Sequence, residues 1–124
     1  MAAPNIVNVT TITGKTGTTS LTSTASTSIV SNAASSNSVV KVNTVIVSNI
    51  DGTNAVNFTL SLNSAAAGGG TNVELASTIS VPANASLIAL DKSTALYLEE
   101  NTSLTCTAGT ASKLKVTVSY EIIS

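Results

Sequence analysis

The stretch ITGKTGTTS, residues 12–20, contains residues that bind phosphate in some proteins. Gly14, Lys15 and Thr16 stand in the order that ends a P-loop, whose pattern GxxxxGK[ST] needs an earlier glycine and a helix directly after it. Val9 occupies the position of that glycine, and the Thr- and Ser-rich residues that follow disfavour a helix. The sequence therefore predicts a turn on the two glycines of the stretch, a solvated lysine and no nucleotide site.

The carboxylates are spread along the chain rather than clustered. They are Asp51, Glu74, Asp91, Glu99, Glu100 and Glu121. The two aspartates stand in predicted turns, where Asp is favoured because it hydrogen-bonds the local backbone. Only Glu99 and Glu100 are adjacent, and neighbours on a strand point to opposite faces. No acid–base pair is predicted.

The chain lacks histidine and arginine, which are the commonest general base and the commonest clamp for phosphate or carboxylate. It has no clustered cysteine or histidine ligands and no Asp-rich loop with calcium spacing. We therefore expect no catalytic residue, no cofactor, no metal site and no enzymatic activity.

Two other side chains could do chemistry. Cys106, the single cysteine, alternates with apolar residues in SLTCTA, which predicts a small buried core residue rather than a reactive thiol. Tyr97 is the one candidate for an aromatic ligand platform, and we interpret it instead as amphipathic packing beside its two leucine neighbours.

The composition excludes several partners. The net charge is -1, charged residues make up 9% of the 124 residues, and aromatic residues 2%. Nucleic-acid binding depends mainly on Lys and Arg, and on aromatic stacking for single strands, so nucleic acid is an improbable partner. The apolar fraction of 43% is too high for a disordered chain, and the length fits one folded domain.

The N-terminal sequence MAAPNIVNV lacks the basic and apolar stretches of a secretory signal, and no apolar run approaches a membrane span. We expect a protein that is made in the cytoplasm and stays in solution or joins a larger particle, without a membrane. The four Asn-x-Ser/Thr sequences, at Asn8, Asn57, Asn84 and Asn101, are interpreted as chance matches in a chain rich in these residues.

Alternation of apolar and polar residues predicts strands along the chain. It is clearest in AVNFTLSLN (residues 55–63) and KLKVTVSYEII (residues 113–123). VELASTISV (residues 73–81) alternates again and should end at Pro82, which lacks an N–H group. The short runs SLIAL, ALYL and SLTCTA follow at a spacing typical of a sandwich or barrel.

The run SVVKVNTVIVSNI, residues 38–50, has apolar residues on both faces, so we expect a strand covered on both sides or a bulge near Thr44. Strict alternation puts Val40, Val42, Ile46 and Ile50 on one face and Val45 and Val47 on the other. Asp51-Gly52 is a turn signal, which predicts a hairpin over residues 39–63. SAAAGGGTN, which follows, is predicted to be a flexible exposed loop.

These patterns predict an all-β, single-domain antiparallel β-sandwich, with jelly-roll and immunoglobulin-like connectivity both open. Residues 39–124 would form its body. Residues 1–38 hold few large apolar residues, and we expect either edge strands or a Ser/Thr-rich arm that orders against a neighbour.

Residues 39–123 resemble small virion structural proteins of tailed bacteriophages, especially marine and cyanobacterial phages. The strand into NIDGTNA, the ISVPANASL strand with its proline exit, LYLEENTSL and the closing VSYEI carry the resemblance through their order and spacing. It implies a non-enzymatic virion protein, first a head decoration or cement protein that contacts the major capsid protein as a homo-oligomer such as a trimer. A neck or tail fitting or a fibre-type protein is the alternative, and a receptor- or glycan-binding module is an alternative of another class.

Overall fold

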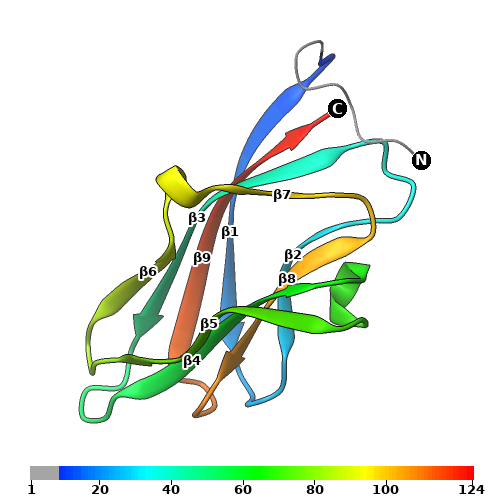
Figure 1. The fold of residues 1–124 in the computed structure, drawn as a ribbon. Helices are drawn as coiled ribbons and strands as arrows, with labels where there is room; N and C mark the ends of the chain where they lie inside the picture. The colour runs from blue at the N-terminus through cyan, green and yellow to red at the C-terminus, as the bar shows by residue number, and fades with distance from the viewer. Residues whose placement is uncertain (1–8) are drawn as a thin grey trace.

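The computed structural model describes residues 9–124, which form nine β-strands and two short 3₁₀ turns (Figure 1). The strands are β1 (Ile12–Leu21), β2 (Thr27–Asn32), β3 (Val39–Asn49), β4 (Val56–Asn63), β5 (Asn72–Val81), β6 (Ser86–Leu90), β7 (Leu96–Leu98), β8 (Thr102–Ala108) and β9 (Leu114–Ile123). The turns are η1 (Ala66–Gly68) and η2 (Lys92–Thr94).

The strands form two antiparallel sheets that pack face to face. One sheet has the order β1-β9-β3-β6, with β7 also paired to β3, and the other has the order β2-β8-β4-β5. Figure 1 shows the two layers crossing the molecule with β9 and β3 in one and β8 and β4 in the other. The predicted all-β antiparallel sandwich is confirmed.

The pairing is nested from the ends of the chain inward. β1 pairs with β9, β2 with β8, β3 with β6 and β7, and β4 with β5. A long hairpin folded over on itself gives this order, which is the connectivity of a jelly roll. Of the two connectivities that the sequence left open, the pairing therefore identifies the jelly roll.

The core lies between the inner faces of the two sheets. Its largest fully buried side chains are Phe58, Leu21, Leu60, Leu98, Leu104 and Leu114, together with valines of β3, β5 and β9. The predicted alternation of β4 and β9 is confirmed, since the apolar residues at even positions, 56–62 of β4 and 114–122 of β9, are buried or half-buried against the core.

A bulge at Asn43 decides which residues of β3 face the core. The register with β9 shifts between Val42 and Thr44, so Val42 and Val45 both point inward although three positions separate them. The expected bulge is confirmed. The face that strict alternation gave to Ile46 and Ile50 is wrong, because the extra residue reverses the alternation: Ile46 is half-buried and Ile50 exposed.

The hairpin predicted over residues 39–63 is wrong. β3 already has β9 on one side and β6 and β7 on the other, so no edge remains for β4, which lies in the opposite sheet. The Asp51-Gly52 segment instead carries the chain from one sheet to the other. β5 ends at Val81 as its proline predicted, but Val73, Leu75 and Ile79 are exposed, because β5 is an edge strand whose register with β4 shifts twice.

Residues 12–32 belong to the sandwich as edge strands. β1 lies at the edge of one sheet and β2 at the edge of the other, and Leu21 and Val30 reach the core. Of the two alternatives for the N-terminal part, edge strands describe these residues. The beginning of the predicted strand NIVNVTTIT, up to Asn8, lies outside the described residues.

Candidate functional site

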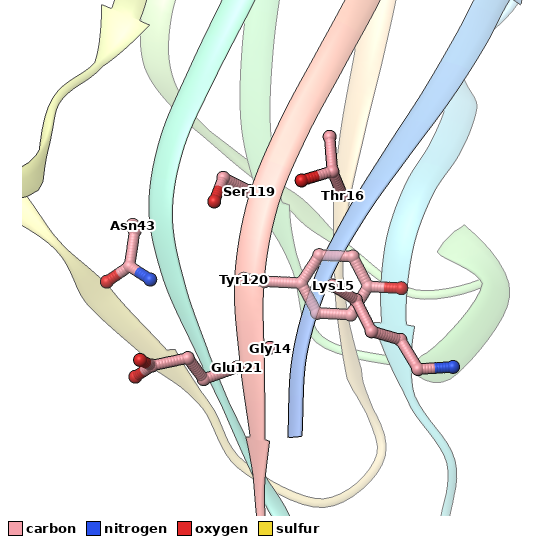
Figure 2. Close-up of a pocket in the computed structure, with 7 residues that line it drawn as sticks. All are labelled: Gly14, Lys15, Thr16, Asn43, Ser119, Tyr120 and Glu121. Atoms are coloured by element: carbon pink, nitrogen blue, oxygen red, sulfur yellow. The ribbon is translucent and has the colours of Figure 1, made fainter. Parts of the chain in front are cut away.

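A shallow hollow of about 310 Å³ lies on the sheet that contains β1, β9 and β3 (Figure 2). It is lined by Gly14, Lys15, Thr16, Asn43, Ser119, Tyr120 and Glu121. The ladder between β1 and β9 brings the Gly-Lys-Thr residues opposite residues 119–121, and the β3 bulge adds Asn43. Gly14 has no atom of another element near its missing side chain, which leaves the hollow open.

The side chains at the hollow divide between the two faces of the sheet. Asn43, Ser119 and Glu121 point to one side and Lys15 and Tyr120 to the other (Figure 2). Asn43, Ser119 and Glu121 lie on the outer face of the sheet. They offer an amide, a hydroxyl and a carboxylate, which can form hydrogen bonds. The amide oxygen of Asn43 is buried and has no hydrogen-bond partner among residues 9–124.

The Gly-Lys-Thr residues do not form the predicted turn. They lie within β1, where an unbroken register of ten residue pairs joins β1 to β9. That pairing explains the correction, because a strand that is paired along its whole length leaves no residue free to turn. A P-loop also needs a helix after the threonine, and β1 instead continues to Leu21.

Asp51 and Asp91 organise turns, as the sequence predicted. Asp51 accepts hydrogen bonds from the N–H groups of Thr53 and Asn54, and these bonds hold its carboxyl pKa below the usual value. Asp91 caps η2 and accepts bonds from the hydroxyl and N–H of Ser93, which lower its pKa in the same way.

The four glutamates have different surroundings. Glu74 and Glu99 are exposed, and Glu121 lies at the hollow. Glu100 accepts a 2.6 Å hydrogen bond from the N–H of Asn37, whose φ of 56° is left-handed. Within the described part of the chain, no three residues among Cys, Asp and Glu gather as metal ligands would.

The predictions for Cys106 and Tyr97 differ in how well they match the structure. Cys106 is buried in the core as predicted, and burial raises the pKa of its thiol by disfavouring the thiolate. Tyr97 is 46% exposed, because it points away from the core that its two leucine neighbours on β7 face. The packing predicted for Tyr97 is therefore partial, since nearly half of the residue is accessible. Asn57, Asn84 and Asn101 are exposed, and Asn8 lies outside the described residues.

The most organised polar groups are ones that the sequence analysis missed. Asn32, Asn49 and Asn63 are the last residues of β2, β3 and β4, and all three are buried. Each amide NH₂ donates to at least two backbone carbonyls, and each amide oxygen accepts a bond from the following segment. An asparagine at a strand end followed by a turn-rich segment was the available signal.

Asn63 holds the segment that covers the outer face of the β2-β8-β4-β5 sheet. Its amide oxygen accepts from the N–H of Ala65 and of Gly70, and its NH₂ donates to the carbonyls of Gly68 and Gly70. Ser103 on β8 donates to the carbonyl of Ala65. These bonds account for a polar layer buried under η1, and they pin the loop that the glycines predicted to be flexible.

A scan of protein-family models and a search of curated proteins found no match to this chain. Among the residues that the structure describes, no helix has the length and apolar character to cross a membrane.

Proposed function

We propose that this protein is a non-enzymatic structural protein of a tailed-bacteriophage virion, and first a decoration or cement protein of the head. The nested strand pairing carries the proposal, because jelly rolls with this connectivity are a common architecture of viral capsid domains. Lectins and cupins share the architecture, so the fold needs support from the surface chemistry.

The exposed polar face supports an assembly role over a catalytic one. The outer side of the β1-β9-β3 region carries rows of small hydroxyl side chains (Thr16, Thr18, Thr44, Thr117 and Ser119) together with the charged residues Lys41, Lys115 and Glu121. Hydroxyl side chains can form hydrogen bonds with a protein that covers this face, and a chain with a net charge of -1 repels its neighbours weakly. Metal-binding cupin chemistry would in addition need histidine ligands, which this chain lacks.

The proposed mechanism is stabilisation by selective binding. Many copies, acting as a homo-oligomer for which the resemblance suggests a trimer, would contact the major capsid protein across its joints. A protein that binds the assembled shell and not its free subunits stabilises the shell by mass action. The proposal needs no nucleic acid, membrane or cofactor.

Quantitative mass spectrometry of purified phage particles tests the proposal. We expect this protein and the major capsid protein in comparable copy numbers, as decoration of the shell requires. A very small ratio would move the protein to the neck or tail, and its absence from the particle would overturn the virion assignment.

Tyr97 favours one candidate of another class, a receptor- or glycan-binding module. The residue is 46% exposed on β7 and lies opposite Lys41 in the register with β3, and exposed aromatic rings are platforms for sugars and cations. A glycan array would test this candidate. Binding that Tyr97→Ala abolishes would support the module, and an array without binding would leave the structural assignment preferred.

A further inference from the structure

The four edges of the sandwich differ in how well they are protected from pairing with another strand. Edge strands are normally blunted by short length, bulges, proline or charge. β2 has six residues and a register shift, β5 has two register shifts and a left-handed residue at Thr78, and β6 and β7 have five and three residues. Each of these edges therefore carries at least one such device.

β1 carries almost none of the features that protect an edge strand from pairing. It is ten residues long, and its register with β9 has no shift. Within residues 9–124 it pairs with β9 alone, so its other edge presents unpaired backbone N–H and C=O groups. Lys15 is its single charge, and Gly14 and Gly17 leave the approach to the backbone open.

We propose that the free edge of β1 pairs with β1 of a second copy of this chain. Antiparallel pairing about a two-fold axis would satisfy both edges with the same set of backbone groups and join two sheets into one. This inference does not depend on the virion assignment. It also gives a two-fold dimer, whereas the resemblance suggested a trimer.

The charge of Lys15 and the side-chain faces of β1 limit the register in which two copies of β1 can pair. A two-fold axis normal to the sheet places one residue opposite its own copy, and centring on Lys15 would oppose two lysines. Centring on Gly17 instead sets Thr16 opposite Thr18 of the partner strand, and centring on Thr16 sets the two Thr16 side chains together. Both registers pair threonines, which is a favourable cross-strand combination. A second copy thus complements this edge without a charge conflict.

Light scattering after size-exclusion chromatography of the purified full chain measures the expected dimer. The wild type should have about twice the chain mass of 12.3 kDa. The variant T16K/T18K should have the monomer mass, because lysines oppose lysines in either register and both positions are exposed in the monomer. Mixing it with T16E/T18E should restore the dimer mass.

The matched control is S77K/S80K, which adds the same charge at two exposed positions of β5. It should remain a dimer, and a cooperative thermal transition checks that each variant is folded. A monomeric wild type, a trimer, or a T16K/T18K variant that keeps the wild-type mass would each overturn the proposal.

Oxidative cross-linking gives a second measurement that needs no charge substitution. A side chain at Gly17 would meet atoms of Val118 and Tyr120 at 3.7 and 3.8 Å, which is ordinary contact. We expect one of the variants Gly17→Cys and Thr16→Cys to form a disulfide dimer, and which one does so reports the register. Ser77→Cys on β5 is the control and should not cross-link. Failure of both β1 variants to cross-link would contradict the pairing.

Discussion

At the scale of single residues, buried polar groups do most to fix the loops. Asn63 is fully buried at the end of β4, and its side chain forms hydrogen bonds with backbone groups of the segment that follows. A buried polar group without a partner costs more than a hydrogen bond gains, so such an asparagine specifies one loop conformation. Asn32 and Asn49 act in the same way at the ends of β2 and β3.

Substitution Asn63→Ala should lower the free energy of unfolding by about 3 kcal/mol, because several buried backbone groups lose their partners at once. Urea denaturation measures the change. Asn57→Ala, at an exposed position of the same strand, is the control and should change stability by less than about 0.5 kcal/mol. Equal effects at the two positions would contradict this role of Asn63.

Cys106 should make stability depend on alkaline pH. Burial raises the pKa of its thiol in the folded state above the ordinary value of 9.0, so its contribution is fully present below pH 9. Above pH 9 the unfolded chain releases the proton while the folded chain keeps it, and stability should fall by about 1.4 kcal/mol per pH unit from this group.

The measurement for Cys106 is the unfolding free energy between pH 8 and pH 10 for the wild type and Cys106→Ala. The wild type should lose more stability over this range than the variant, in which every other titratable group is unchanged. Parallel pH profiles would show that the thiol makes no such contribution.

At the scale of elements, the bulge in β3 sets the inward face of a central strand. Asn43 is the extra residue, and with it Val42 and Val45 both reach the core. Because Val42 and Thr44 already pair with consecutive residues of β9, the ladder on either side of Asn43 is regular.

Deletion of Asn43 should therefore be tolerated, although it removes a residue from the middle of a strand. It joins two regular ladder segments and keeps the inward valines inward, so we expect cooperative thermal unfolding within about 2 kcal/mol of the wild type. β9 has no bulge, so deletion of Thr117 moves the side chains of one half of that strand to the opposite face of the sheet. This variant should not fold. The opposite ranking of the two variants would overturn this account of the bulge.

At the scale of the whole molecule, nested pairing ties the two ends of the described chain together. β1 forms an uninterrupted ladder with β9, and the N–H groups of Thr10 and Thr11 both reach the carbonyl of Ser124. The sandwich therefore depends on residues from the first and last strands.

Removal of residues 1–24 should abolish cooperative unfolding. The truncation takes away all of β1, including the buried Leu21, and exposes the edge of β9. Circular dichroism during heating would record the loss of a sharp transition. A truncated protein that still unfolds cooperatively would mean that the N-terminal strand is dispensable, as an arm would be.

The sequence alone determined the all-β class, the alternation of β4 and β9, the buried Cys106 and the turns at Asp51 and Asp91. These depend on local periodicity and on side chains that bond their own backbone, so neighbouring residues suffice to predict them. The bulge in β3 was also foreseen, because apolar residues on both faces fit one.

Only the tertiary structure decided which strands pair, and therefore that β3 and β4 lie in different sheets and that Gly14–Thr16 lie within a strand. Period-two alternation describes a strand's faces and contains no information about its neighbours. The buried asparagines were missed for the same reason, since Leu98 and Val81, whose carbonyls Asn32 and Asn49 bind, are distant in the sequence.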